Sequence, residues 1–289
     1  SKGGGLARLA GRFLGVPTVY TPHSLIMSAP DLSPMERIVY TLIERLLGHW
    51  ATSKIIAVSD EEREFILNLK LVPSGRVAVI ENGIDDQDFD YLAEEPIRSI
   101  DGSNPLTFGS IMRFSPQKAP EHLIAAFIEL HRSLPNLPMR LLIAGHGELF
   151  AEAQKQVAES GLQENISLLG WRTDTKEVLH DFDIFVLPSL YEGFSYAILE
   201  AMAARLPIVS TNVFGTRGTI LRVPGNVVVP VGDPAALADG MQQMATLTAM
   251  DSLRPALRKI GDANQDYVRA HFRNSDTTRR IVELYQALR

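Results

Sequence analysis

The chain has 289 residues, a length that predicts two domains. Its 45% hydrophobic and 21% charged residues are typical of a globular protein, and its formal charge of −6 argues against a surface that binds nucleic acid. The absence of cysteine excludes disulfides, thiolate zinc sites, iron–sulfur clusters and cysteine nucleophiles, and no apolar run is long enough to span a membrane.

The first hundred residues alternate helical and strand-like segments. The patterns predict helices over 5–14, 34–48 and 60–70, and strands over 16–20, 54–58 and 77–80. Ser33 with Pro34 suits the start of the second helix, because serine caps a helix and proline fits its first turn. Residues 85–104 are acidic and contain proline and glycine, and we interpret them as a linker. We therefore expect a first domain over 1–100 that contains about half of a sheet.

The alternation becomes more regular after the linker. The sequence predicts strands over 106–112, 139–145, 166–170, 183–189, 207–211 and 227–230, and helices that begin near Pro120, Glu148, Asp174, Ser195 and Pro234. Apolar strands separated by helices form a parallel sheet that is buried on both faces. Six such strands make one complete doubly wound domain, expected over 101–289. The predicted fold class is α/β, with two Rossmann-like doubly wound domains of which the first is incomplete.

The loop after the strand 106–112 carries two cations. In a doubly wound sheet, ligands bind at the carboxyl ends of the strands, on loops that open helices. Arg113 and Lys118 lie five residues apart in this loop and suit a diphosphate, the first through a forked contact and the second as a point charge. A solvated pair of surface cations explains the same spacing equally well.

Two further strand-end loops carry residues suited to a nucleotide. Gly145 and Gly147 allow the backbone to approach a ligand, and the helix after them favours an anion or a polar base edge. His146 between them is expected to be exposed rather than catalytic. Trp171 and Arg172 follow the next strand, where the indole can flank a base or pack against the fold.

The segment after the strand 183–189 is the most informative. Ser195 fits an N-cap, so its helix directs free backbone N–H groups toward the strand ends. Glu192 precedes this helix and Glu200 lies on it. Eight helical residues span roughly 12 Å, which exceeds the ~5–9.5 Å of glycosidase carboxylate pairs. We therefore expect the two carboxylates to hold different parts of one long ligand, such as a ribose and a hexose; alone, they would be interpreted as solvated side chains.

These motifs occur together and in order. The chain contains RFSPQKAPEHLIAAF, AGHGE, LLGWRTD, DIFVLPSLYEGFSYAILEAMAARLPIVST and VPVGDPAALA. The run resembles the donor domain of the family 4 glycosyltransferases, which have the two-domain GT-B fold. The resemblance covers 105–250 in detail and extends weakly to the first domain through VYTPHS, IIAVSDEE and VIENGID. Its most specific element is the Glu-x7-Glu segment, which follows a strand and opens a helix.

The resemblance implies a retaining transfer of a sugar from a nucleotide-diphosphate sugar, UDP- or GDP-linked, with no permanently bound cofactor and no metal on the protein. It implies that Arg113 and Lys118 neutralise the leaving diphosphate, which is electrostatic stabilisation. Glu192 would bind the donor sugar, Glu200 the ribose hydroxyls, and His23 would reach the transferred sugar from the first domain. Further donor contacts are implied for the backbone of Gly193, Phe194 and Ser195, and for the loops of Gly145, His146, Gly147, Trp171 and Arg172 around the base.

The acceptor implied is a glycan or a lipid-linked glycan, as in surface polysaccharide or glycolipid biosynthesis. The expected location is the cytoplasm or the inner face of its membrane. Peripheral membrane contact is compatible with such acceptors, although residues 1–100 hold 10 Lys+Arg against 14 Asp+Glu and therefore show no basic patch. No nucleic-acid partner is expected. The last helix, about 274–289, is expected to pack back on the first domain.

Several positions depart from the family pattern. Ala119 replaces a frequent glycine after the lysine, and Arg205 stands where a small residue is usual. The loop FGTRG at 214–218 replaces the usual Gly-Gly-x-Pro-acidic loop near the sugar. The chain also opens at Ser1 with no initiator methionine and no preceding strand and glycine loop, and we expect ~50–100 residues of the first domain to be absent in front.

Other functions stay open. A non-catalytic nucleotide-sugar-binding fragment would explain the missing front and the altered 214–218 loop, and a GT-B nucleotide-sugar epimerase would share the fold. A phosphorylase would need a phosphate or cofactor site that the sequence does not reveal. A dinucleotide oxidoreductase is disfavoured because no Gly-x-Gly-x-x-Gly fingerprint follows a strand.

Overall fold

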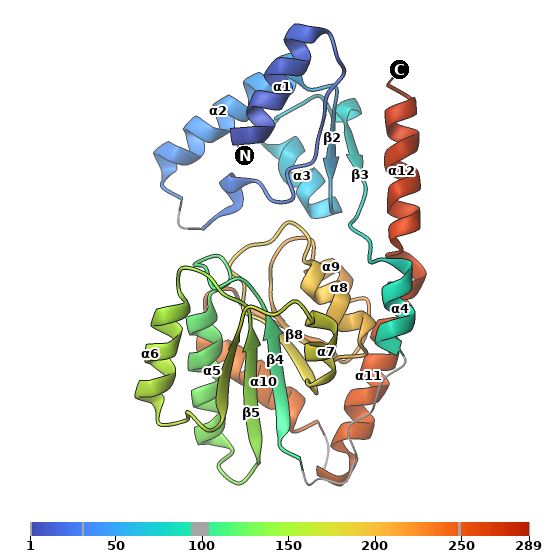
Figure 1. The fold of residues 1–289 in the computed structure, drawn as a ribbon. Helices are drawn as coiled ribbons and strands as arrows, with labels where there is room; N and C mark the ends of the chain where they lie inside the picture. Colours follow the sequence, from blue (N-terminus) through green and yellow to red (C-terminus); the bar gives the residue numbers. More distant parts are fainter. Residues whose placement is uncertain (1, 31, 94–103, 248–249, 289) are drawn as a thin grey trace.

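The computed structural model describes residues 2–30, 32–93, 104–247 and 250–288. It contains two parallel sheets with helices packed around each (Figure 1). We refer to residues 2–93, which carry the first sheet, as the first domain, and to the part with the second sheet as the second domain. The predicted boundary at residue 100 lies outside the described residues and stays a prediction.

The first domain is built around three parallel strands in the order β1-β2-β3. Its elements are α1 (Lys2–Leu14), β1 (Val19–Tyr20), η1 (Ile26–Ser28), α2 (Pro34–Ala51), β2 (Lys54–Ala57), α3 (Asp60–Asn68), η2 (Ser74–Arg76), β3 (Val77–Val79) and α4 (Asp86–Ala93). Ser33 caps α2 as predicted. Its side chain accepts a bond from the Glu36 backbone N–H, and the Glu36 carboxylate accepts one from the Ser33 N–H.

The second domain is built around six parallel strands in the order β6-β5-β4-β7-β8-β9. Its elements are β4 (Leu106–Ile111), α5 (Pro120–Ser133), β5 (Met139–Ala144), α6 (Phe150–Ser160), β6 (Ile166–Gly170), α7 (Thr175–His180), β7 (Ile184–Leu187), α8 (Tyr196–Ala203), β8 (Ile208–Thr211), α9 (Arg217–Ile220), β9 (Val227–Val229), α10 (Pro234–Ala245) and α11 (Met250–His271). A last helix, α12 (Asn274–Gln286), follows them in the chain. The predicted α/β class with Rossmann-like parallel sheets is confirmed.

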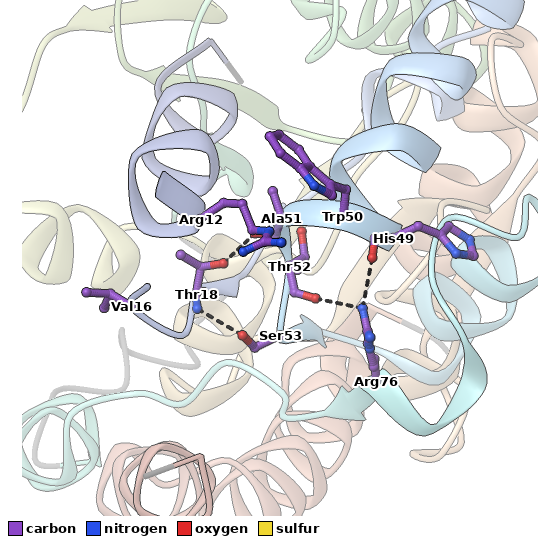
Figure 2. Close-up of a pocket in the computed structure, with 9 residues that line it drawn as sticks. All are labelled: Arg12, Val16, Thr18, His49, Trp50, Ala51, Thr52, Ser53 and Arg76. Carbon is purple, nitrogen blue, oxygen red and sulfur yellow. Dashed lines mark hydrogen bonds between the residues drawn. The ribbon is translucent and has the colours of Figure 1, made fainter. Parts of the chain in front are cut away.

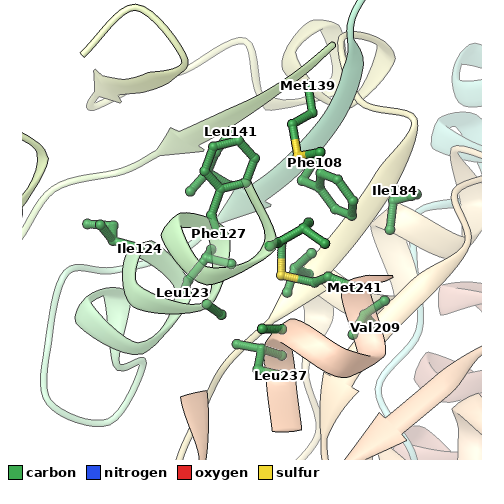
Figure 3. Packing of buried hydrophobic residues seen from close by; sticks show 14 of the residues in the cluster. Phe108, Leu123, Ile124, Phe127, Met139, Leu141, Ile184, Val209, Leu237 and Met241 are labelled. Atoms are coloured by element: carbon green, nitrogen blue, oxygen red, sulfur yellow. The ribbon is translucent and has the colours of Figure 1, made fainter. Parts of the chain in front are cut away.

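The six-stranded sheet is buried on both faces. On one face, Phe108 of β4 meets Phe127 of α5 and Met241 of α10, all fully buried (Figure 3). On the other face, Phe185 of β7 and Met202 of α8 belong to a second buried cluster. A strand covered on both sides needs apolar side chains at nearly every position, which explains why the sequence predicted all six strands.

The first domain is less completely covered. The outer faces of α1 and α2 expose large apolar side chains, which include Leu6, Phe13, Leu14, Met35, Ile38 and Leu46. Most of the large hydrophobic side chains exposed in the described ranges lie on these two helices or close to them. The first domain therefore presents a much more apolar surface than the second.

The interpretation of 85–104 as a linker is wrong for its first part. Residues Asp86–Ala93 form helix α4, whose Phe89 and Leu92 are buried in the same cluster as Val178 of α7. These two apolar residues stand at helical spacing among the acidic ones, and burial of that face against the second domain outweighs the loop-like composition. Residues 94–103 lie outside the described residues.

The chain passes between the domains twice, and the two crossings run side by side. Ile84 forms a parallel bridge with Arg273, through bonds from Ile84 N to Phe272 O (2.9 Å) and from Asn274 N to Ile84 O (2.8 Å). Gly83 makes this approach possible, because a Cβ there would lie 2.7 Å from the Asn274 N and Cα atoms. The two segments therefore form one paired connection.

Helix α12 continues from the second crossing along the first domain (Figure 1). Thr277 Oγ1 donates to Glu81 O (3.0 Å), and the Arg280 guanidinium donates to Val79 O (2.6 Å). These bonds attach the last helix to the end of β3.

Replacement of Gly83 by alanine tests the paired crossing. The new methyl group would press on the Asn274 backbone, and overpacking of this kind costs about 1–3 kcal/mol. We expect Gly83→Ala to lower the free energy of unfolding by that amount in urea denaturation. Gly75→Ala is the matched control, because nothing lies within 4 Å of a Cβ at Gly75. Equal stability of the two variants would contradict the role given to Gly83.

Candidate functional site

The carboxyl ends of the two sheets face each other (Figure 1). The loop after β1 contacts the loop after β7, since a Cβ at Gly193 would lie only 2.2 Å from His23 O. The loops after β5 and β6 are joined by a bond from Gly145 N to Gly170 O (2.8 Å). The structure thus gathers the loops singled out in the sequence at one end of the second sheet, opposite the first domain.

An ion pair between Lys118 and Glu192 joins the loops after the neighbouring strands β4 and β7. The two side chains are only 20% and 8% exposed. Ser189 Oγ donates to the same carboxylate oxygen (2.7 Å), and Leu190 N donates to Gln117 O (2.8 Å). The carboxylate is therefore held by two donors, while the lysine keeps part of its surface for a ligand.

Arg113 lies five residues before Lys118 and is exposed. Its guanidinium forms no hydrogen bond or ion pair among the described residues and is therefore available to an anion. Ala119, directly after the lysine, has a φ of 46°, and Arg205 has a φ of 59°. Both are left-handed conformations that glycine adopts most easily. Glycine would therefore fit either position without strain.

The loop that opens α8 offers backbone groups to its surroundings. Ser195 occupies the N-cap position as predicted, but its Oγ makes no capping bond and is buried without a hydrogen-bond partner in the described part of the chain. The Phe194 ring is buried against Phe272, with ring centroids 5.5 Å apart. The first N–H groups of α8 therefore have no side-chain cap. Their expected contact with the donor, through Gly193 to Ser195, stays a prediction.

The loop of His23 is held in an unusual backbone conformation. His23 has a φ of 54° and Ser24 a φ of 138°, and such non-glycine residues persist only where their surroundings fix them. Desolvation lowers the pKa of His23 from its ordinary value of 6.5, because the charged imidazolium loses more hydration than the neutral ring. The imidazole is therefore neutral at pH 7 and can both donate and accept a hydrogen bond.

Glu200 lies on α8 in surroundings unlike those of Glu192. Burial raises the pKa of Glu200, the nearby Asp88 raises it further, and Lys176 opposes them. Asp88 of α4 and Lys176 of α7 form an ion pair of their own. Glu192 is thus paired directly with Lys118, whereas the pKa of Glu200 is raised mainly by desolvation. This difference fits two separate roles.

The two glycines of the AGHGE loop are required by packing within the protein. A Cβ at Gly145 would lie 1.8 Å from Met112 O, and one at Gly147 would lie 2.3 Å from Phe114 O. His146 between them is exposed, as expected, and stacks on Phe150 with ring centroids 4.6 Å apart. Another strand-end loop thus approaches these glycines closely, and the predicted approach to a ligand stays a prediction.

Trp171 and Arg172 lie on the neighbouring loop. The Trp171 side chain is 76% exposed, so the structure places it on the surface instead of in the core. Arg172 forms an ion pair with Asp174, and this hydrogen bond lowers the pKa of the Asp174 carboxyl. An exposed indole beside an ordered guanidinium is compatible with a flat aromatic ligand.

Asn82 is a functional candidate that the sequence did not reveal. The Asn82-Gly83 pair predicted only a turn, but the Asn82 amide donates to Phe194 O (3.2 Å) and is 5% exposed. The bond joins the first crossing to the loop that opens α8. No sequence signal could have found it, because the partner lies 112 residues further along the chain.

The described residues also contain features away from this site. Figure 2 shows a cavity of about 420 Å³ at the opposite end of the first sheet, where Thr18 and Ser53 precede β1 and β2. Arg76 donates there to His49 O and Thr52 O, both at 3.2 Å, and so stabilises the end of α2. This cavity lies apart from the strand-end site.

No three His, Asp or Glu side chains of the described ranges come together as a metal site, and the expectation about metals stays a prediction. No helix in the same ranges is both long enough and apolar enough to cross a bilayer.

Two family models match consecutive parts of the chain. The model described as "Glycosyltransferase Family 4" matches residues 1–88, and the one described as "Glycosyl transferases group 1" matches residues 105–246. Together they cover both sheets and every strand-end loop described above.

Curated relatives and solved structures agree with this match. The chain is 31% identical over 224 residues to the UDP-Gal:alpha-D-GlcNAc-diphosphoundecaprenol alpha-1,3-galactosyltransferase of Escherichia coli, a match that covers 74% of this chain and 57% of that protein. It is 29% identical over 176 residues to the amylovoran biosynthesis glycosyltransferase AmsK of Erwinia amylovora, covering 57% and 41% of the two chains. The crystal structure of HepE of Anabaena in complex with UDP superposes with a TM-score of 0.78 at 19% identity, covering 99% and 76%.

The chain spans little more than half the length of three of its curated relatives, at 57%, 54% and 52%. Its two-sheet architecture and motifs nevertheless match on both sides of the predicted boundary. The fold is GT-B, and the chain belongs to the family 4 glycosyltransferases.

Proposed function

We propose that the protein is a retaining glycosyltransferase, which moves a sugar from a UDP- or GDP-linked donor to a glycan or lipid-linked acceptor. The observation that carries this proposal is the ion pair of Lys118 with Glu192 beside the uncapped start of α8. It combines a cation for phosphate, a carboxylate for hydroxyls and a helix N-terminus at the carboxyl ends of a parallel sheet. Family membership supports the same reading.

Sugar transfer from a nucleotide-diphosphate donor requires stabilisation of the leaving diphosphate. Transfer breaks the bond between the sugar carbon and the diphosphate and forms a bond to an acceptor oxygen, so negative charge grows on the diphosphate. Lys118 and the exposed Arg113 are placed to meet this charge. Glu192 has one oxygen bound by Lys118 and Ser189, and its other oxygen is available to a sugar hydroxyl.

The other predicted residues complete the donor site in this proposal. Glu200 binds the ribose hydroxyls, and the backbone at Gly193 to Ser195 faces the sugar and phosphates. The loops of His146 and Trp171 border the base. His23 reaches the transferred sugar from the first domain, consistent with the contact of its carbonyl with Gly193.

The likeness to other proteins supports the classes of donor and acceptor. HepE has been crystallised with UDP and with UDP-glucose, and the E. coli relative is named for a UDP-galactose donor and a diphosphoundecaprenol-linked acceptor. AmsK is named for polysaccharide biosynthesis. We propose a role in surface polysaccharide or glycolipid synthesis, in the cytoplasm or at the inner face of its membrane, with peripheral contact to the bilayer.

Removal of the lysine tests the proposal most directly. We expect Lys118→Ala to lower kcat by about 10²–10³-fold, because one preorganised donor to a developing charge is worth that much. The measurement is release of the nucleotide and transfer of labelled sugar to candidate acceptors. Lys155→Ala is the matched control, since Lys155 is exposed on α6 and 75% of its side-chain surface is accessible.

The same assay separates the proposal from its alternatives. An unchanged rate of sugar transfer by Lys118→Ala would contradict the proposed role of Lys118 at the diphosphate. Binding of a nucleotide sugar by the wild-type protein without transfer to any acceptor would identify a binding fragment, and conversion of the sugar without an acceptor would identify an epimerase.

Glu200→Ala tests the proposed ribose contact. We expect it to weaken binding of the nucleotide itself by about tenfold or more in calorimetry, because a hydrogen bond to a charged group contributes about 1.5–3 kcal/mol. Glu159→Ala, an exposed residue of α6, serves as the control. Unaltered affinity of Glu200→Ala for the nucleotide would contradict this role.

The pKa of His23 predicts how the reaction depends on pH. The lowered pKa keeps the imidazole neutral, so the rate should fall only as the pH drops below 6.5 toward the value in the folded protein. The folded state loses stability over the same window, because protonation is easier in the unfolded chain. We expect His23→Gln to lack this acidic limb in a pH–rate profile, and NMR titration of the ring to give a pKa below 6.5. An acidic limb of the same shape in the variant would exclude His23 as its source.

A further inference from the structure

One face of α3 contacts the altered loop at 214–218 across the domain interface. The Phe65 and Phe214 rings lie 6.0 Å apart between centroids. One helical turn earlier, Glu61 Oε1 would lie 3.0 Å from a Cβ at Gly218. Figure 1 shows the corresponding end of α3 opposite α9. Phe65 and Glu61, one helical turn apart on α3, thus lie against Phe214 and Gly218 of the second domain.

The contact lies beside the candidate site. A Cβ at Gly215 would lie 2.0 Å from Gly193 O, so the 214–218 loop packs directly on the loop that carries Glu192. The first domain therefore brings the Glu61 carboxylate to the edge of the place where the transferred sugar is proposed to bind.

The Glu61 carboxylate has no cation to pair with. Among the described residues it forms no hydrogen bond or ion pair, although its side chain is half-buried. Glu61 also lies near Glu81: burial raises the pKa of Glu81, Asp60 and Glu61 raise it further, and Arg280 and His271 oppose them. A partly buried carboxylate without a donor is free to accept a hydrogen bond from a ligand hydroxyl.

Gly218 of the second domain lies directly opposite the Glu61 carboxylate. Gly218 has an ordinary backbone conformation, and the one group close to its missing side chain is the Glu61 carboxylate. Position 218 of the second domain carries no side chain, so the carboxylate at this place comes from the first domain.

We propose that Glu61 is a specificity-determining residue, whose carboxylate accepts a hydrogen bond from a hydroxyl of the transferred sugar. The inference rests on the proposed glycosyltransferase function. It assigns to the first domain a contact with the donor sugar itself, made only while α3 and the 214–218 loop are together. A donor whose sugar lacks a hydroxyl at that place would lose the contact.

The experiment exchanges the carboxylate between the two domains. The probe is whichever of UDP-glucose, UDP-galactose and GDP-mannose the wild-type protein turns over, compared with its nucleotide alone. For Glu61→Ala we expect affinity for the nucleotide sugar to fall about ten- to a hundredfold, with affinity for the nucleotide unchanged. Addition of Gly218→Glu to that variant should restore most of the loss, because the alanine frees the space that the new side chain needs.

The controls keep folding and function apart. Glu64→Ala removes an exposed carboxylate from the same helix and should leave both affinities unchanged. Unfolding in urea checks that each variant is folded. The proposal is overturned if Glu61→Ala binds the nucleotide sugar normally, if it weakens nucleotide and nucleotide sugar alike, or if Gly218→Glu restores nothing. Turnover of no donor by the wild-type protein would instead overturn the proposed function, and the inference with it.

Discussion

The paired crossing of Ile84 and Arg273 is the constraint on which the rest of the arrangement depends. Two chain segments, one entering the second domain and one leaving it, are joined there by backbone hydrogen bonds. Gly83 permits their approach, and Asn82 extends the connection to the loop that opens α8. The contacts of His23 and Glu61 with the second domain require this connection, because each comes from a strand-end loop or helix start of the first sheet.

The two domains contribute different kinds of chemical group to the candidate site. The second domain holds the charges that suit a nucleotide diphosphate, with Lys118 fixed by Glu192 and Ser189 at the end of its sheet. The first domain contributes groups that suit hydroxyls, a neutral imidazole at His23 and an unpaired carboxylate at Glu61. In the proposed function, charge neutralisation therefore belongs to the second domain alone, whereas recognition of the sugar depends on both domains.

The sequence predicted what depends on local pattern. All nine strands were expected, because buried parallel strands are apolar at nearly every position, and the strand-end loops followed from topology. Helix α4 was missed because its acidic composition resembles that of a linker. Its two apolar residues, Phe89 and Leu92, indicate a helix only once their burial against the second domain is known. The bond of Asn82, the uncapped Ser195 hydroxyl and the position of Glu61 were also beyond prediction. The bond of Asn82 and the position of Glu61 depend on residues distant in the chain, which residue type and spacing do not reveal. The Ser195 hydroxyl is buried without a hydrogen-bond partner in the described part of the chain, and spacing alone cannot distinguish it from a capping hydroxyl.

Helix α12 belongs to the first domain by its hydrogen bonds, although it follows the second domain in the chain. In topological terms the second domain is therefore an insertion into the first, attached by the two chain segments that pair at Ile84 and Arg273. A body tethered by a single flexible segment can swing in any direction. A body held by two paired segments has fewer directions in which it can turn, because a hinge motion must change the backbone of both segments together. Opening and closing would then bring the same residues back into the same register each time.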